Sequence, residues 1–349
     1  MTLETRKQAF ANLGSFLMQF TSEDLMFSSN ERAFAKQMSK AITAAIQHNG
    51  WFTKESIYFS LNQWGKSLSV GRLNQWLDRY DLTGSKAKTV AVIMAGNVPL
   101  VGFHDFMTVL LSGHKVLVKQ SSKDKFLLPC LVKFLISENS EFADLVEFTD
   151  DRLNAFDAVI ATGSDNTARY FEYYFAKKPH IIRKNRNSVA VLTGQETERE
   201  LKLIGEDIFR YHGLGCRNVS KLFVPKGYEF SKFFEAIFHW NPIINHHKYA
   251  NNYDYNKAVY LMSEFKILEN GFLILKEDEH YASPIACLFY DYYDDEHALQ
   301  EKLHRDSEKI QCVVSANRKF GKVDFGETQR PRLKDYADNV DTLAFLSKL

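Results

Sequence analysis

Cys216 is the residue in this sequence whose position best suits covalent chemistry. It lies in the stretch GLGCRN, residues 213–218, between a helix-like segment and an apolar, strand-like one. A glycine-flanked turn lets a substrate carbonyl approach closely, and the adjacent Arg217 would favour the nucleophilic thiolate. Cysteine is more often a small buried hydrophobe, and the other three lie in apolar runs that fit this description: Cys130, Cys287 and Cys312. From the residues alone, a nucleophile and a structural cysteine both remain open for Cys216.

Asn97 is a second candidate for chemistry. It comes just after the apolar run TVAVIM, residues 89–94, in a turn that also contains Gly96 and Pro99. An amide in such a loop can donate to the oxyanion of an acyl-transfer intermediate. Asparagine is also a common turn former, so the residue type alone does not decide between the two interpretations.

Two further loops suit a nucleotide. A strand-like run ends at Lys119 and is followed by Ser121 and Ser122, which places cationic and hydroxyl groups where a phosphate or ribose could bind. Solvated charges at an exposed strand end are the alternative. The turn Gly163-Ser164 leads from a strand into a helix, whose first N–H groups form an anion site. Because ligands bind beyond the carboxyl ends of parallel strands, we expect all four loops there.

Hydrophobic periodicity predicts the elements that position these loops. Residues 5–80 carry apolar residues at helical spacing, with one helix expected from the candidate N-cap Asn30 to Gly50. Beyond residue 88, strand-like and helix-like runs alternate, which predicts βαβ units and an α/β fold. The expected strands are 89–94, 114–120, 155–164 and 188–194, and the expected helices are 125–138 and 166–178.

The alternation continues with new material after residue 190. Helices are expected at 198–213 and 230–238, and strands at 220–225 and near 259, 272, 286 and 312. A chain of 349 residues is too long for one simple core. We therefore expect three parts: a cofactor-binding lobe with a helical N-terminal region, 1–187; a catalytic lobe with the nucleophilic cysteine, 188–325; and a tail that packs back on the body, 326–349.

Composition excludes several classes of protein. A net charge of +1 gives no electrostatic basis for binding nucleic acid or an anionic membrane. No apolar run approaches the length of a membrane span, and no signal core follows the initial methionine. The four cysteines are widely spaced and form no metal-binding pattern. We expect a cytoplasmic protein without a metal.

Taken in order, the four loops resemble the aldehyde dehydrogenase superfamily over about residues 88–320. GNVPLVGF is similar to its Asn-x-Pro oxyanion turn, GHKVLVKQSS to its lysine-terminated cofactor strand, ATGSDNTARYF to its Thr-Gly-Ser turn, and GLGCRNVSKLFVP to its nucleophile loop. The stretches HHKYANNYDYNKAVYLM and FGETQRPRLKDYADNVDTLAFL bring the chain closer to the LuxC-type acyl-CoA reductases. This resemblance implies an aldehyde dehydrogenase-like fold of two lobes, each with a mainly parallel sheet.

The resemblance also implies roles for individual residues. Cys216 would take the acyl group, while the Asn97 amide and the Cys216 backbone N–H would hold the oxyanion. The implied cofactor contacts are Lys119, Ser121 and Ser122 at the adenosine ribose, Gly163 and Ser164 at the pyrophosphate, and Glu279 at the nicotinamide ribose. His212 could relay a proton or simply end a helix near the negative end of its dipole. His246 and His247 are adjacent and lack metal spacing.

Departures from the superfamily pattern indicate the direction of the reaction. Hydrolytic members carry a glutamate base close to the position of Arg183, and this chain has no carboxylate between Glu172 and Glu196. Releasing a free acid requires a base that activates water, whereas reducing a thioester by hydride does not. NAD-preferring members carry a glutamate where this chain has Ser122, followed by Lys123. That change favours NADPH, with NADH left open.

The expected activity is therefore the NADPH-dependent reduction of an acyl-CoA, or another acyl thioester, to an aldehyde. The alternatives are an aldehyde-oxidising or acyl-phosphate-reducing enzyme and a non-reducing acyl-binding partner. An acyl-transferring protein partner and a homo-oligomer are both compatible with the sequence. Little room exists before the Asn97 turn for the superfamily's oligomerisation arm, so its quaternary structure is not carried over.

Overall fold

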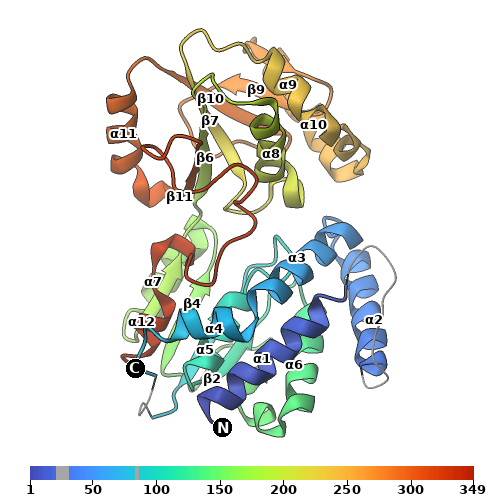
Figure 1. The fold of residues 1–349 in the computed structure, drawn as a ribbon, viewed down its shortest axis with the longest axis vertical. Coiled ribbons are helices and arrows are strands. Elements are labelled where there is room, and N and C mark those ends of the chain that lie inside the picture. Colours follow the sequence, from blue (N-terminus) through green and yellow to red (C-terminus); the bar gives the residue numbers. More distant parts are fainter. Residues whose placement is uncertain (21–30, 83–85) are drawn as a thin grey trace. The chain divides into compact units, whose positions relative to one another are not determined.

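The computed structural model describes residues 1–20, 31–82 and 86–349. The chain divides into two units, one formed by Met1–Lys184 together with Arg332–Leu349 and the other by Asn185–Pro331. The first division falls close to the boundary expected at residue 187. The second falls after Pro331 rather than after residue 325. Figure 1 shows the helices and strands of each unit.

The first unit begins with helices, which confirms the helical character predicted for the described part of residues 5–80. They are α1 (Leu3–Leu17), α2 (Arg32–His48), α3 (Lys54–Ser67) and α4 (Val70–Leu77). A capping box starts α3, in which the Thr53 and Ser56 side chains each accept a hydrogen bond from the other's backbone N–H. The expected cap Asn30 lies outside the described residues, and α2 ends at His48, before Gly50.

A parallel sheet follows, with strand order β3-β2-β1-β4-β5. Its strands are β1 (Thr89–Ile93), β2 (Lys115–Lys119), β3 (Val146–Phe148), β4 (Ala158–Thr162) and β5 (His180–Arg183). The helices between them are α5 (Phe103–Leu111), α6 (Leu127–Glu138) and α7 (Asp165–Phe175), with a short 3-10 helix η1 (Ser140–Asp144). The sequence predicted β1, β2, β4, α6 and α7, but not the two edge strands or α5.

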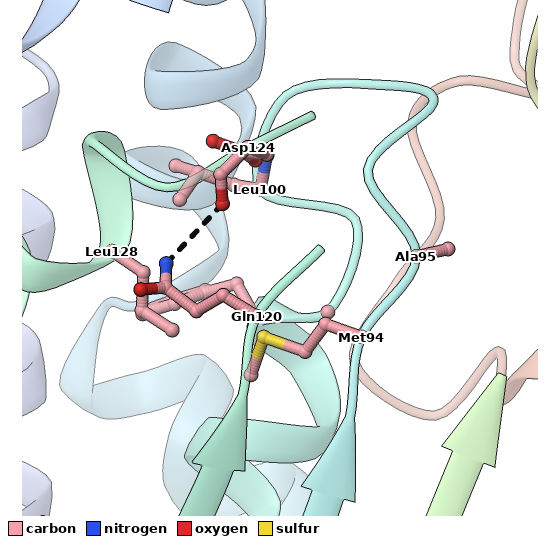
Figure 2. Close-up of a pocket in the computed structure, with 8 residues that line it drawn as sticks. Met94, Ala95, Leu100, Gln120, Asp124 and Leu128 are labelled. Atoms are coloured by element: carbon pink, nitrogen blue, oxygen red, sulfur yellow. Dashed lines mark hydrogen bonds between the residues drawn. The ribbon is translucent and has the colours of Figure 1, made fainter. Parts of the chain in front are cut away.

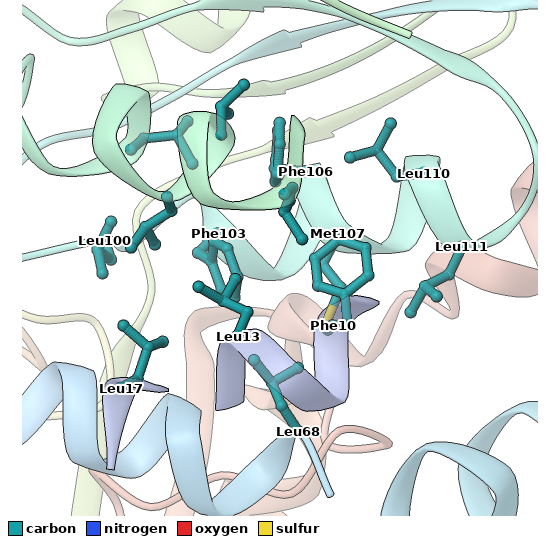
Figure 3. Close-up of a cluster of buried hydrophobic side chains, with 14 of the residues drawn as sticks. Phe10, Leu13, Leu17, Leu68, Leu100, Phe103, Phe106, Met107, Leu110 and Leu111 are labelled. Carbon is teal, nitrogen blue, oxygen red and sulfur yellow. The ribbon is translucent and has the colours of Figure 1, made fainter. Parts of the chain in front are cut away.

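Period-two alternation gives the sheet of the first unit two apolar faces. Val90 and Val92 of β1 belong to the large core that includes α1, α2, α3, α5 and α6. Ala91 and Ile93 point to the other face, against Phe171 and Phe175 of α7. Figure 3 shows where α1 and α5 meet in the large core. The residues labelled there are Phe10, Leu13, Leu17, Leu68, Leu100, Phe103, Phe106, Met107, Leu110 and Leu111.

Residues 332–349 return to the first unit and add the 3-10 helix η5 (Ala337–Asn339) and α12 (Thr342–Leu346). Arg183 at the end of β5 forms a buried ion pair with Asp105, 2.8 Å long, and its guanidinium also donates to Thr342 Oγ1. Tyr336 accepts a hydrogen bond from the Trp76 indole at 2.8 Å. This segment is thus tied to β5 and α4 by buried polar contacts.

The second unit contains a six-stranded sheet of order β11-β6-β7-β10-β9-β8. Its strands are β6 (Asn187–Val191), β7 (Val219–Pro225), β8 (Ile267–Glu269), β9 (Ile274–Glu277), β10 (Cys287–Tyr293) and β11 (Ile310–Val314). All neighbouring pairs are parallel except β8 with β9. This confirms a mainly parallel second sheet.

Helices flank the sheet of the second unit on both sides (Figure 1). They are α8 (Glu198–Phe209), α9 (Ser231–Ile237), α10 (His247–Met262) and α11 (Glu296–Arg305), with the 3-10 helices η2 (Arg210–Gly213), η3 (Phe238–Asn245) and η4 (Ser307–Lys309). The strand predicted near residue 259 is wrong, because this run ends α10. The buried residues of α10 recur at helical spacing, which is visible in the sequence: Tyr249, Tyr253, Asn256 and Tyr260.

Among residues 1–20, 31–82 and 86–349, no helix combines the length and the apolar character that a bilayer crossing demands.

Candidate active site

Three of the predicted site loops lie together at one edge of the first unit's sheet. Asn97 follows β1, Lys119 ends β2 and Gly163 follows β4, and these three strands are parallel neighbours. Their carboxyl ends therefore meet at the same edge, where an open α/β sheet binds its ligands. Cys216 and Glu279 belong to the second unit.

The turn that carries Asn97 is held firmly from several sides. Asn97 is half-buried between Gly96 and a core-facing Val98. Ser60 of α3 donates to the carbonyl of Pro99 at 2.9 Å. Leu100 adopts a left-handed backbone with φ of 57°, which is costly for leucine and persists only where the surroundings enforce it. A rigid turn of this kind can aim an amide at a reacting oxygen.

The loop after β2 contains polar groups, some of which already have hydrogen-bond partners within the chain. The Lys119 ammonium donates to the carbonyl of Asp151 at 2.7 Å and retains two further N–H donors. Ser121 accepts from the backbone N–H of Lys123 at 3.2 Å. Ser122 and Lys123 are exposed, and the Ser122 carbonyl lies 2.6 Å from His48 Nε2. The exposed pair is therefore the part of this loop that is most open to a ligand, whereas Lys119 and Ser121 are half-buried.

Gly163 and Ser164 form the start of α7. A Cβ on Gly163 would lie 3.0 Å from Thr167 and 3.1 Å from Phe171, so glycine allows the turn to pack closely on the helix. Ser164 is the N-cap residue, and its hydroxyl accepts from the N–H of Thr167. The predicted strand–turn–helix is thus present at the carboxyl edge of the sheet. The glycine has a packing reason that is independent of any ligand.

The second unit presents Cys216 on a short turn. The N–H of Asn218 donates to the carbonyl of Gly215 at 2.9 Å and closes the turn, with Cys216 at its second position. Cys216 is exposed, whereas Cys130 and Cys287 are buried and Cys312 is half-buried. One expectation was wrong: the loop leads from a helix into β7, so it lies at the amino end of that strand rather than at a carboxyl end.

Asn218 is the residue that fixes this turn, and the sequence analysis missed it. Its Oδ1 accepts from the N–H of Gly215 at 2.8 Å. Its Nδ2 lies within 3.2 Å of three carbonyl oxygens at the end of α8, which a helix C-terminus leaves without internal partners. Ser188 of β6 donates to the Cys216 carbonyl at 3.0 Å. Asn218, only 2% exposed, thereby joins the cysteine turn to α8.

Replacing Asn218 by alanine should loosen the cysteine turn. The change leaves the Gly215 N–H and the helix-end carbonyls without their partner, so we expect the free energy of unfolding to fall by about 2–4 kcal/mol. Chemical denaturation measures this, and amide hydrogen exchange at Gly215 should become faster. Asn252→Ala is the control, since that side chain donates to the carbonyl of Lys248 within α10. Equal losses in the two variants would contradict the assignment.

Backbone strain precedes the cysteine turn. Tyr211 and His212 are left-handed, with φ of 56° and 58°, and Gly213 follows with φ of 77°. Burial, assisted by His246 and Arg210, lowers the pKa of His212 to about 4, so its ring is uncharged at neutral pH. His212 follows α8, as expected, but an uncharged ring gains nothing from the helix dipole.

The two histidines of this region pack against each other. The rings of His212 and His246 pack with their centroids 4.2 Å apart, and His246 Nδ1 caps α10 by accepting from Tyr249. Within the described part of the chain, no group of three His, Cys, Asp or Glu residues could hold a metal ion.

Glu279 lies in the loop between β9 and β10 and is exposed. On either side of it, the carbonyl of Asp278 accepts from Lys221 Nζ, and the carbonyl of Tyr281 accepts from Ser220 at 2.7 Å. The loop therefore runs beside the first residues of β7, shortly after Cys216 in the chain. Burial would raise the pKa of Asp278, but hydrogen bonds from Lys276 and His280 outweigh it and lower the pKa to about 2.

Comparison with known proteins identifies the family. A model of the acyl-CoA reductase (LuxC) family matches residues 28–236. The chain belongs to this family. The resemblance to this family is thereby confirmed. In this LuxC-family chain, Arg183 is buried and ion-paired.

A curated relative is similar to part of this LuxC-family chain. Long-chain acyl-protein thioester reductase from Aliivibrio fischeri is 28% identical over 144 residues, which span 37% of this chain and 29% of the relative. The match thus covers less than a third of that protein's length.

The solved structures establish the fold. An aldehyde dehydrogenase from Physcomitrella patens, in complex with succinate, matches with a TM-score of 0.66 and 11% identity, covering 100% of this chain and 84% of its own. An indole-3-acetaldehyde dehydrogenase complexed with NAD+ has a TM-score of 0.62 and 13% identity, and the match covers 91% of this chain and 77% of that protein. A Bacillus cereus aldehyde dehydrogenase has a TM-score of 0.61 and 13% identity, and the match covers 91% of this chain and 76% of that protein. The LuxC-family chain has the aldehyde dehydrogenase-like fold.

Proposed function

We propose that this protein is an NADPH-dependent reductase that takes the acyl group of a fatty acyl thioester onto Cys216 and releases it as an aldehyde. Membership of the acyl-CoA reductase family supports this proposal. The observation that carries it furthest is the exposed Cys216 thiol on a turn fixed by Asn218 and Ser188. A rigid, accessible thiol is the arrangement that nucleophilic catalysis requires.

The residues of the first unit fit a dinucleotide. Lys119, Ser122 and Lys123 provide cationic and hydroxyl groups at the carboxyl edge, and α7 begins there with Ser164 as its cap. We propose that Lys119, Ser121 and Ser122 hold the adenosine ribose. The start of α7, at Gly163 and Ser164, would bind the pyrophosphate through backbone N–H groups. Glu279 is proposed for the nicotinamide ribose, and NADPH, when bound, supplies the hydride.

In the proposed reaction the Cys216 thiolate attacks the thioester carbonyl. The carbon–sulfur bond to the leaving thiol breaks, and the acyl group remains on Cys216 as a thioester. The Asn97 amide and the Cys216 backbone N–H stabilise the negative charge that develops on the carbonyl oxygen. After reduction the carbon–sulfur bond to Cys216 breaks, which frees the aldehyde and restores the thiolate.

The acyl donor in this proposal is an acyl-CoA or an acyl-protein thioester. The name of the matched relative specifies a long-chain acyl-protein thioester, so a protein that delivers the acyl group is a second donor class. Charge alone does not select between them, because the chain's net charge is only +1.

The decisive experiment is anaerobic turnover with a series of acyl-CoA chain lengths, an acyl-protein thioester and both reduced nicotinamides. We expect aldehyde formation, with labelled acyl chain on Cys216 as an intermediate that NADPH discharges. A chain that stays on Cys216 in the presence of both nicotinamides would favour the non-reducing acyl-binding protein. Faster reaction with acyl phosphate would favour an acyl-phosphate reductase, and faster reaction with free aldehyde and the oxidised nucleotide would favour an aldehyde-oxidising enzyme.

Nucleotide preference can be tested at Ser122. Ser122→Glu places a carboxylate where the 2′-phosphate of NADPH is proposed to bind, so we expect the ratio of kcat/KM for NADPH to that for NADH to fall by about tenfold or more. Steady-state kinetics with both nucleotides measures this. Ser122→Ala, which removes the hydroxyl without adding charge, should change the ratio much less. An unchanged ratio in Ser122→Glu would contradict the proposed contact.

A further inference from the structure

A buried carboxylate joins the Asn97 turn to the proposed nucleotide loop. Asp124, only 9% exposed, lies in the loop that follows β2, and its Oδ2 accepts the backbone N–H of Leu100 at 2.8 Å. The same two segments touch at a second place: a Cβ on Gly96 would lie 2.6 Å from Ser121 Oγ and 3.2 Å from the Asp124 nitrogen. Figure 2 shows Asp124 beside Leu100 and the Gln120 amide donating to the Asp124 carbonyl.

The hydrogen bond from Leu100 satisfies a strained residue. Leu100 is left-handed, and its side chain is 3% exposed within the large core between α1 and α5. The side chain is fixed in the core, and the bond to Asp124 gives the N–H of this left-handed residue a partner. A bond to an ionised acceptor is stronger than a neutral one. Asn97 lies three residues earlier in the same turn.

The structure around Asp124 argues against a direct role in binding a substrate. The cavity beside it measures about 10 Å³, enough for one water molecule and too small for a substrate. Within the described residues, its Oδ1 has no hydrogen-bond partner. Burial raises the pKa of Asp124 to about 6, whereas the hydrogen bond from the Leu100 N–H lowers it. A buried charge with one backbone partner is costly, which argues for a function at this position.

We infer that Asp124 is a positioning residue for the reaction: it holds the turn at Leu100 so that the Asn97 amide is aimed at the developing oxyanion. This inference rests on the proposed function. Asp124 is buried and contacts the turn at Leu100, so in this inference its effect on the reaction passes through Asn97. Removing its carboxylate leaves the Leu100 N–H without a partner and lets the turn relax, and a displacement of about 1 Å costs on the order of a hundredfold in rate.

A double-mutant cycle tests this role. The measured quantity is the single-turnover rate at which a labelled long-chain acyl-CoA acylates Cys216, in wild type, Asp124→Ala, Asn97→Ala and the double variant. We expect Asp124→Ala to slow acylation by about tenfold to a hundredfold. The same change in the Asn97→Ala background should cost less than about threefold, since residues that act through one another are not additive. Asp124→Asn, which keeps an acceptor for Leu100, should recover most of the rate.

Asp157→Ala is the matched control. Its carboxylate accepts the backbone N–H of Thr89 at 2.8 Å, at the opposite end of β1 from the turn, and we expect an unchanged acylation rate. If Asp124→Ala does not fold, as judged by circular dichroism, Asp124→Ser replaces it in the cycle.

The outcomes separate this inference from the proposed function. Equal losses from the Asp124 change in both backgrounds, or no loss while Asn97→Ala is slow, would overturn the inference alone. A wild-type protein that takes no acyl group onto Cys216 would instead contradict the proposed function, and the inference with it.

Discussion

Cys216→Ala will abolish formation of the acyl-enzyme and, with it, aldehyde production. The thiolate is the atom that takes the acyl group in the proposed reaction, and no side chain can replace it. Removal of a catalytic nucleophile costs on the order of a millionfold in turnover. Intact-protein mass spectrometry after incubation with acyl-CoA, and NADPH consumption, measure the two losses. Because Cys216 is exposed, alanine should leave the stability of the second unit nearly unchanged.

Cys312→Ala is the control for this experiment. Cys312 belongs to the same unit and lies 2.9 Å from Ser188 Oγ, but burial raises the pKa of its thiol to about 11. It is therefore a poor nucleophile at neutral pH. The Cys312→Ala variant should form the acyl-enzyme on Cys216 as the wild type does. Acylation that survives in Cys216→Ala and disappears in Cys312→Ala would show that Cys312 is the nucleophile instead.

Asn97→Ala is expected to have the second-largest effect. Deleting one oxyanion donor costs about a hundredfold to a thousandfold in rate, and the structure holds Asn97 in a turn that Ser60 and Asp124 support. Acylation should slow by this factor while the dissociation constant for NADPH stays nearly constant. Pre-steady-state kinetics and equilibrium nucleotide binding measure the two quantities.

Asn166→Ala is the matched substitution for Asn97→Ala. Asn166 is an exposed asparagine in the first turn of α7, and we expect its acylation rate to equal that of wild type. A loss of NADPH binding in Asn97→Ala without a change in the acylation rate would place Asn97 at the nucleotide instead of the oxyanion.

The sequence predicted the fold where periodicity was strong. Runs such as TVAVIM alternate between two buried faces and became β1, while the short edge strands β3 and β5 carry too few apolar residues to stand out. Helix α5 was missed because it is buried on nearly every side and shows no polar stripe. The prediction near residue 259 failed because it rested on a short apolar run alone, without the helical spacing of tyrosines that precedes it.

The site could be predicted only as a set of residue types in loops. Motif order selected Cys216, Asn97, Lys119 and Gly163 as candidates, and Cys216 is exposed in the structure. The contacts that hold these loops were not predictable, because they join residues distant in the chain, such as Ser60 with Pro99. A polar residue just before a buried strand, such as Asn218, is the one local signal that could have indicated a supporting role.

The return of residues 332–349 to the first unit has a consequence for biosynthesis. Thr342 accepts a hydrogen bond from Arg183, and the carbonyl of Leu346 lies 3.0 Å from His114 Nε2, so Arg183 and His114 lack these two contacts until residues 342–346 leave the ribosome. The second unit is continuous in the chain and can complete its sheet earlier during translation. Synthesis of the first unit therefore begins before that of the second unit and ends after it. Until then, the incomplete first unit must avoid aggregation.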